Sequence, residues 1–212
     1  MQQIDRVKLW LFIFLRATVV AAGILSVVYE DWDRLVLSVV TFIVMFFPSI
    51  LEKRLKVDFP SQFDIMMVVF IYAAMFLGEM NSFYDRFWWW DIMLHTFSGL
   101  IVGAIGFTLV YTLNSHEKVA ISLSPLFVAI FSFCFALAFD ALWEIYEYGM
   151  DCAFGFNMQK DGLNDTMTDL IVDTIGAVAF SIIGYLYLKG KIKFLYRFTI
   201  RDLREKKRQI KG

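Results

Sequence analysis

Long apolar segments separated by short polar stretches make up most of the 212-residue chain. Six of these segments approach the length of about 20 residues that an α-helix needs to cross a bilayer. They lie at 9–29, 35–51, 64–80, 91–113, 122–148 and 167–188. The pattern therefore predicts an all-α fold, a polytopic membrane bundle of six transmembrane helices within 1–188. A basic tail at 189–212 follows the bundle.

The composition agrees with a membrane protein. Hydrophobic residues make up 59% of the chain, charged residues only 19%, and the mean hydropathy is +0.61. A soluble domain would need more charged residues to cover so much apolar surface. The composition therefore excludes a soluble enzyme or a soluble binding domain.

The positive charges are concentrated on one side of the predicted bundle. With six spans, the N-terminus, 52–63, 114–121 and 189–212 lie on the same side, and they contain 16 of the 20 Lys and Arg residues. The positive-inside rule therefore predicts that both termini are cytoplasmic. The tail is typical of a cationic segment lying on anionic membrane lipids. We expect membrane lipids as partners and no nucleic acid.

Acidic side chains recur at helical spacing inside the fifth apolar segment. Asp140, Glu144, Glu147 and Asp151 follow one another at steps of four, three and four. These steps place them in a stripe about 60° wide on one helix face. An ionised side chain in the membrane costs at least about 2.5–3.5 kcal/mol on insertion scales. Such residues therefore indicate a functional site.

The two neighbouring segments carry matching polar residues. Asp165, Asp169 and Asp173 repeat at steps of four into the sixth segment, and Asp91 and His95 do the same into the fourth. A rise of about 1.5 Å per residue puts all these groups in the outer half of the bilayer. The simplest arrangement is a shared cavity that opens outward.

Two chemical interpretations of these acids remain open. Either a divalent metal neutralises the carboxylates, or several of them are protonated and share hydrogen bonds. Oxygen ligands with one imidazole suit Mg²⁺, Mn²⁺, Ca²⁺ or iron, and Zn²⁺ less well. The predicted metal ligands are Glu144, Glu147, Asp169, Asp173 and His95. The metal-free alternative includes a network that merely holds the helices together.

Roles can be assigned to the other polar residues as well. His95 and Glu147 are the candidate catalytic residues, because an imidazole or a carboxylate can move a proton. The candidate supporting residues are Asp91, Asp140, Asp151, Asp165 and Ser98. Asp91 and Asp151 lie at the water boundary, where solvation alone would explain them, and Asp165 has the alternative role of a helix N-cap.

Several known chemistries are excluded by the residues present. The chain has only two histidines, which rules out histidine-box di-iron sites and three-histidine zinc sites. It contains neither an H-E-x-x-H nor a G-x-S-x-G motif. Cys134 and Cys152 lie about 27 Å apart along an ideal helix, which excludes a disulfide between them.

Three stretches carry a family resemblance: WDIMLHTFSG at 90–99, ALWEIYEYGMD at 141–151 and QKDGLNDTMTDLIVDTIGA at 159–177. Together they resemble the YjdF-like family of bacterial inner-membrane proteins and, more distantly, the VanZ-like family associated with teicoplanin resistance. The matching residues are Asp91, His95, Glu144, Glu147, Asp169, Asp173 and Gly176. Thr174 and Glu147 replace the Asn and Gln that are usual in the VanZ-like form. The resemblance implies the fold, the polar site and a bacterial inner membrane, but no reaction.

Three functions fit these observations. The leading hypothesis is a metal-dependent membrane hydrolase or transferase, or a binding protein, that acts on a lipid or lipid-linked headgroup at the outer leaflet. A proton or divalent-cation transporter would also use intramembrane carboxylates, but it needs polar groups in the inner half too. A non-enzymatic structural or regulatory protein would tolerate neutral substitutions in the cluster. The sequence leaves the substrate, the metal and the oligomeric state open.

Overall fold

The computed structural model describes residues 2–55, 61–114, 123–160 and 162–192, and within these ranges it contains helices and turns but no strand. The predicted all-α fold is thus confirmed. The helices are α1 (Gln2–Val28), α2 (Trp32–Val44), α3 (Phe47–Leu55), α4 (Ser61–Ile71), the π-helix η1 (Tyr72–Met80), α5 (Phe83–Arg86), α6 (Trp90–Asn114), α7 (Pro125–Phe154) and α8 (Leu163–Leu188). Of the tail predicted at 189–212, all but the first four residues lie outside the described ranges.

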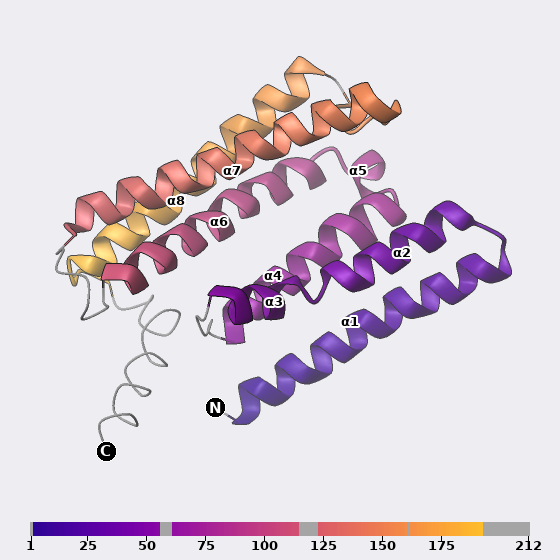
Figure 1. The fold of residues 1–212 in the computed structure, drawn as a ribbon, viewed down its shortest axis with the longest axis horizontal. Coiled ribbons are helices and arrows are strands. Elements are labelled where there is room, and N and C mark those ends of the chain that lie inside the picture. Colours follow the sequence, from indigo (N-terminus) through magenta and orange to yellow (C-terminus); the bar gives the residue numbers. More distant parts are fainter. Residues whose placement is uncertain (1, 56–60, 115–122, 161, 193–212) are drawn as a thin grey trace. The chain divides into compact units, whose positions relative to one another are not determined.

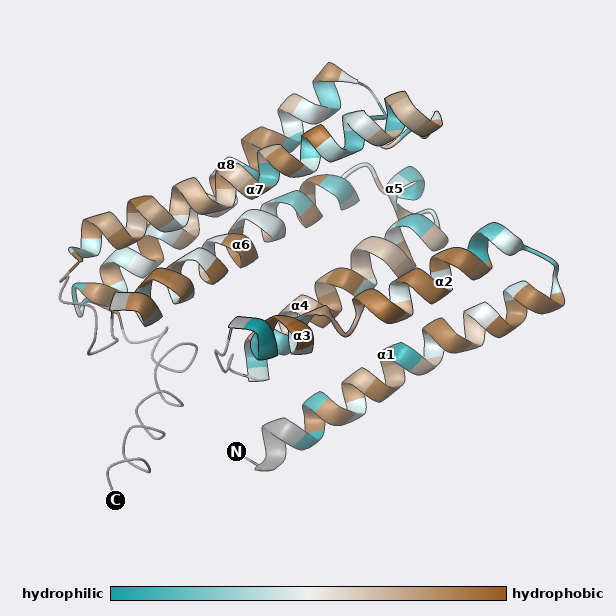
Figure 2. Ribbon diagram, in the orientation of Figure 1, coloured by the Kyte–Doolittle hydropathy of each residue, from teal (hydrophilic) through white to brown (hydrophobic). Residues whose placement is uncertain are grey.

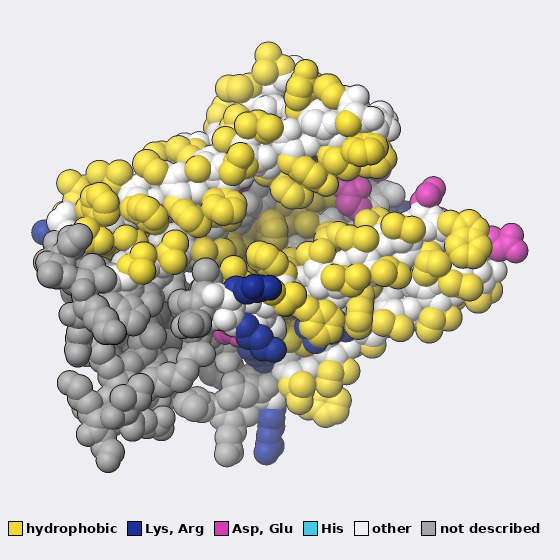
Figure 3. All heavy atoms as spheres, in the orientation of Figure 1, with side chains coloured by type: hydrophobic (Ala, Val, Ile, Leu, Met, Phe, Trp, Pro, Cys, Tyr) yellow, Lys and Arg dark blue, Asp and Glu magenta, His cyan; other side chains and the backbone are white. Residues whose placement is uncertain are grey.

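Within the part of the chain that the structure describes, six helical stretches are long and apolar enough to cross a membrane, as the hydropathy pattern predicts. They are Arg6–Val28, Trp32–Arg54, Ser61–Met80, Trp90–Tyr111, Pro125–Phe154 and Leu163–Leu188. Large hydrophobic side chains are exposed along these helices, and Figure 3 shows them covering much of the visible face. Such a surface suits contact with lipid tails rather than water. The fifth span ends at Phe154 rather than at 148, and the sixth begins at Leu163 rather than at 167.

The described helices form two compact units (Figure 1). The first contains α1–α5 with η1, and the second contains α6, α7 and α8. All residues of the predicted polar site belong to the second unit.

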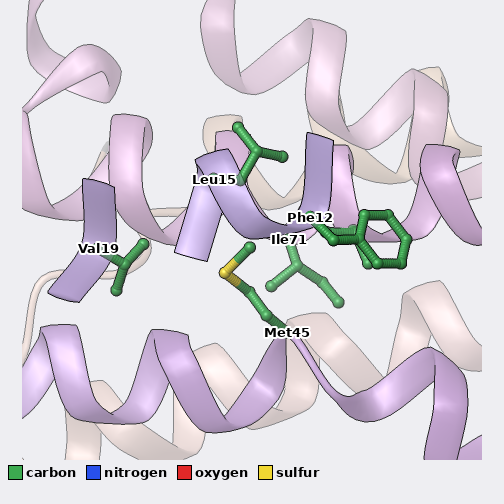
Figure 4. Packing of buried hydrophobic residues seen from close by; sticks show 6 residues of the cluster. Phe12, Leu15, Val19, Met45 and Ile71 are labelled. Carbon is green, nitrogen blue, oxygen red and sulfur yellow. The ribbon is translucent and has the colours of Figure 1, made fainter. Parts of the chain in front are cut away.

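Apolar side chains from α1, α4 and the end of α2 fill the core of the first unit. Figure 4 shows Phe12, Leu15 and Val19 of α1 facing Met45 and Ile71. These α1 residues are spaced three and four apart, so they share one face of the helix. The core therefore follows directly from the apolar periodicity of α1.

The second predicted span is interrupted between α2 and α3. Pro48 has no N–H group and cannot bond to the carbonyl of Val44, which favours a break at this point. The Arg16 guanidinium donates a hydrogen bond to the Met45 carbonyl at 3.2 Å and lies 3.9 Å from the centre of the Phe46 ring. Arg16 therefore satisfies part of the backbone that the break leaves free.

Each helix of the second unit runs antiparallel to the one before it in the chain, so α6 and α8 are parallel (Figure 1). Glycines bring α6 and α8 together backbone to backbone. A Cβ atom on Gly99 would overlap the Asp173 carbonyl oxygen, and one on Gly176 would overlap the Thr96 carbonyl oxygen. Close approach at small residues is typical of helix pairs in membranes. Both cysteines are free, as their separation requires.

Candidate functional site

The polar residues of the second unit gather at the end where α7 leads into α8. Figure 2 shows hydrophilic positions on α6, α7 and α8 toward this end. Asp140, Glu144 and Glu147 of α7 are all buried, with 3%, 5% and 9% of their surface exposed. Asp169 and Asp173 of α8 are 3% and 1% exposed. The acidic stripe of α7 therefore faces the neighbouring helices and not lipid.

His95 of α6 is the centre of this group. Its Nδ1–H group donates a hydrogen bond to Asp173 Oδ2 at 2.9 Å. Its Nε2 atom lies 3.7 Å from Asp91 Oδ1 and 3.9 Å from Asp169 Oδ2, beyond hydrogen-bond distance. The bond to Asp173 fixes the ring orientation and leaves Nε2 directed toward the other carboxylates.

Three of these side chains are arranged as metal ligands would be. One ligand atom from each of His95, Glu144 and Asp169 lies within 4.8 Å of the other two. Each residue comes from a different helix, so the group exists only when all three helices are packed. A second such group, Asp91, Asp165 and Asp169, shares Asp169 and is less buried. We call His95, Glu144 and Asp169 the ligand triad.

Glu144 stands out within the ligand triad. Its side chain is buried, and neither carboxylate oxygen has a hydrogen-bond partner of normal geometry. The Thr166 hydroxyl faces this carboxylate and accepts a hydrogen bond from the Gln159 side-chain amide at 2.5 Å. A buried carboxylate without a partner costs several kcal/mol on general grounds. Its two oxygens are therefore available to a ligand.

A deeper pair of acids lies one turn further from this end. The Ser98 hydroxyl donates a hydrogen bond to Asp140 Oδ1 at a long distance of 3.4 Å. Asp140 Oδ2 and Asp173 Oδ1 are buried without a hydrogen-bond partner. Asp140 and Ser98 thus border the ligand triad as supporting residues, and Asp173 holds His95 instead of joining the triad.

Glu147 also stays outside the ligand triad. Its Oε1 atom accepts a hydrogen bond from the Trp143 indole N–H at 2.9 Å. Sequence reasoning did not identify Trp143, although its position one turn before Glu147 is a signal for such a contact. Glu147 lies one turn closer to the helix end than Glu144.

The remaining supporting residues organise the connection between α7 and α8. Asp151 accepts hydrogen bonds from the backbone N–H groups of Met158 at 2.7 Å and Gln159 at 2.9 Å. Asp165 accepts one from the backbone N–H of Lys160 at 3.2 Å. The alternative role of Asp165 as an N-cap is wrong, because the cap position of α8 is Gly162 and Asp165 lies in the first turn.

The two ends of α7 determine how far along the helix its acids lie. The Ser124 hydroxyl caps the helix by accepting a hydrogen bond from the Phe127 N–H, and Pro125 occupies the first turn. Gly155 ends the helix with a φ of +69°, a conformation that glycine adopts without strain. Glu144 therefore lies ten residues, or about 15 Å, before the end of a continuous helix.

The site carries more negative than positive groups. The buried acids of the cluster, defined as Asp140, Glu144, Glu147, Asp169 and Asp173, surround one imidazole. One histidinium can neutralise at most one of them. Protons or a bound cation must neutralise the rest, because unpaired charges are unstable at this burial.

These features define a class of protein: a helical membrane protein with six candidate spans and a buried carboxylate–histidine cluster in its last three helices. Residues 7–190 match the family model described as predicted membrane protein (DUF2238), and the chain belongs to this family. A protein of Thermotoga maritima named "Uncharacterized protein" is 30% identical over 156 residues, which cover 72% of this chain and 76% of that protein. No solved structure matches the chain.

Proposed function

We propose that the ligand triad binds one divalent metal ion and that the protein acts on a lipid or lipid-linked headgroup at this site. The observation that carries the proposal is Glu144, buried and without a hydrogen-bond partner beside His95 and Asp169. A carboxylate in this state needs a positive partner, and no atom of normal bonding geometry among the described residues supplies one.

The spacing of the ligand triad supports a metal ion. Bonds of about 2.1 Å on opposite sides of an ion place two ligand atoms about 4.2 Å apart. Ligand atoms within 4.8 Å of one another therefore need a shift of less than about 1 Å to close on an ion. One nitrogen with carboxylate oxygens suits Mn²⁺ or Fe²⁺, Mg²⁺ or Ca²⁺ with added water, and Zn²⁺ less well.

The partner of His95 supports the same conclusion. Metal-binding histidines commonly donate the N–H group of their second nitrogen to a carboxylate, which fixes the ring and makes the ligating nitrogen more basic. Asp173 accepts such a bond from Nδ1 of His95. Asp173, predicted as a ligand, thus acts in this proposal as the orienting residue.

A lipid headgroup is the proposed substrate because of the depth of the site. His95 lies five residues into α6, or about 8 Å below Trp90. Trp88, Trp89 and Trp90 form a cluster of aromatic residues of the kind that marks the membrane interface. The ligand triad therefore lies just below the headgroup level, where a phosphoryl or acyl ester group can reach it.

The proposed chemistry is hydrolysis or group transfer. A metal ion held by three protein ligands keeps positions free for a substrate oxygen or water, which it would polarise. Glu147, one turn nearer the helix end, is the residue proposed to take or give the proton. Its hydrogen bond from Trp143 would hold the carboxylate in place.

Two other functions are less well supported. A transporter needs charged groups along the whole membrane path, yet 96–114, 125–139 and 174–188 of α6, α7 and α8 contain no Asp, Glu, His, Lys or Arg. A purely structural network would leave Glu144 without a partner. Robust flux of protons or divalent ions in liposomes would favour transport over the site proposed here.

The proposal is tested by metal analysis of the purified full-length protein. Wild type should retain about one ion per chain after dialysis against Mn²⁺ or Zn²⁺, and the double variant Glu144→Gln with Asp169→Asn should lose it. Glu147→Gln is the matched control, because it removes one charge from the same helix without touching the ligand triad. Equal metal content in wild type and the double variant would refute the ligand assignment.

We propose further that the protein is the YjdF-like form of its family, that it lies in a bacterial inner membrane and that both termini are cytoplasmic. The distribution of Lys and Arg supports this orientation. The distant likeness to the VanZ-like family stays a prediction from the motifs. Cys152 is exposed in the last turn of α7 and provides a direct test. In a Cys134→Ser variant, an impermeant thiol reagent should label Cys152 from the periplasmic side, and labelling from the cytoplasm would reverse the orientation.

A further inference from the structure

A second feature lies at the opposite end of α7 and α8, away from the carboxylate cluster. It is a groove of about 320 Å³ with an entirely apolar accessible lining. The lining residues are Leu126, Ala129, Ile130, Phe133, Val178, Ser181, Ile182 and Tyr185. The volume is at the lower end of the range for small-molecule pockets. We call this feature the α7/α8 groove.

One polar group in the α7/α8 groove has no partner. Ser181 is 8% exposed, and its hydroxyl makes no hydrogen bond among the described residues. Hydroxyl groups in membrane helices usually bond to the carbonyl four residues earlier. Thr96 and Thr174 do so, at 2.8 and 2.6 Å. Ser181 departs from this pattern, but its hydroxyl oxygen is buried, so the walls of the groove expose only apolar atoms to an occupant.

A positive charge lies at the mouth of the α7/α8 groove. Lys189 follows the last residue of α8, and its Nζ atom lies 5.8 Å from the centre of the Tyr185 ring, which lines the groove. Tyr185 is one turn, or about 6 Å, from Ser181 along the helix. The ammonium group therefore lies beside the ring that lines this end of the groove.

The depth of the α7/α8 groove matches one leaflet. Phe133 lies about 12 Å from the start of α7 at Pro125, and Ser181 about 10 Å from the end of α8 at Leu188. Half of the hydrocarbon core is about 15 Å thick. The groove thus covers the upper part of the lipid tails, with Lys189 at the level of the phosphates.

From these observations we infer that the α7/α8 groove binds an anionic glycerophospholipid of the leaflet opposite the metal site. Lys189 pairs with the phosphate, and one acyl chain lies between the apolar walls. A helix is a poor fit, because it is about 10 Å wide and contacts neighbours over many turns, whereas this groove covers only two. The inference is independent of the proposed metal site.

The test measures binding of single lipids to the full-length protein by native mass spectrometry. Phosphatidylglycerol and phosphatidylcholine are added to delipidated protein in detergent, and the dissociation constant of the first lipid is determined for each. Wild type should bind phosphatidylglycerol about fivefold more tightly, the effect expected for one lysine near a lipid phosphate. Equal affinity for the two lipids in wild type would overturn the inference.

Variants separate the lysine from the groove. Lys189→Gln should remove the preference for phosphatidylglycerol, while Lys191→Gln, a matched change two residues along, should keep it. Equal losses in both would show diffuse surface charge and overturn the assignment of the phosphate.

Filling the groove tests the acyl chain. Ala129→Phe on the floor and Ile182→Trp on the exposed rim should each weaken both lipids at least tenfold. The rim variant keeps the test decisive if the floor variant fails to fold, and circular dichroism with gel filtration reports on the folding of each variant. Undiminished lipid binding by a folded Ile182→Trp protein would show that another part of the protein fills the groove.

Discussion

The contact between α6 and α8 determines whether the ligand triad can form, and Gly176→Ala tests this contact directly. The new Cβ atom would overlap the Thr96 carbonyl oxygen and lie 3.1 Å from the Leu100 backbone nitrogen. Both neighbours are backbone atoms of a continuous helix and cannot rotate away. The two helices must therefore separate by about 1 Å to restore normal contact distances.

A separation of this size acts on His95. The bond from its Nδ1 atom to Asp173 measures 2.9 Å, and hydrogen bonds are lost beyond about 3.5 Å. Overpacking costs about 1–3 kcal/mol, and leaving the buried histidine and aspartate unpaired adds a similar amount. We therefore expect Gly176→Ala to lower the free energy of unfolding by about 2–6 kcal/mol and to weaken metal binding about 10- to 100-fold.

Gly149→Ala is the matched control. Gly149 lies on α7, and a Cβ atom there meets nothing within 4 Å. This change should leave metal binding unchanged and stabilise the helix by up to about 1 kcal/mol, since alanine is the better helix former. Unfolding in mixed micelles, followed by tryptophan fluorescence, compares the two variants. If Gly176→Ala were as stable as Gly149→Ala, the close contact of α6 and α8 would be refuted.

Three further predictions concern other contacts. Asp151→Ala removes the acceptor of the Met158 and Gln159 N–H groups. Hydrogen exchange in the α7–α8 connection should therefore become faster while α6 stays protected. Unchanged protection of the connection would contradict the role of Asp151. Trp143→Phe should leave metal content unchanged and lower any hydrolase or transferase activity, because Trp143 bonds to Glu147 and not to the ligand triad. Loss of metal in this variant would place Glu147 among the ligands. Lys8→Met leaves Asp64, whose side chain is 4% exposed, without its ion pair. The free energy of unfolding of the first unit should therefore fall by about 1–3 kcal/mol. Unchanged stability would show that the ion pair contributes little.

Hydropathy and helical periodicity were sufficient to predict the membrane spans and the inward face of α7. Steps of four, three and four between the acids allow only one narrow stripe on a helix, and no tertiary information is needed to find it. The break between α2 and α3 was missed, although Pro48 provides a local reason for it. The π-helix η1 was also missed, since its pattern of apolar residues is the same as that of an α-helix.

The detailed partners within the site depend on packing that a single sequence does not contain. Asp169 and Asp173 have the same residue type and lie one turn apart on the same face of α8. Only the height at which α6 crosses α8, determined by the Gly99 and Gly176 contacts, directs Nδ1 of His95 to Asp173 and Nε2 toward Asp169. A shift of one turn would exchange their roles. Periodicity therefore predicts which residues meet, while the backbone contacts decide which aspartate bonds to His95.

The close helix contact also explains why the acids cannot simply separate from one another. Mutual repulsion of carboxylates would favour moving α6 and α8 apart, which a bundle held by large flexible side chains could allow. Here the glycine contacts form beside His95 and Asp173, so the acids stay close to one another. In a protein stabilised by tight packing, such a cluster can retain unsatisfied oxygens like those of Glu144 until a ligand arrives. The helix packing and the proposed metal affinity are therefore two consequences of the same glycine contacts.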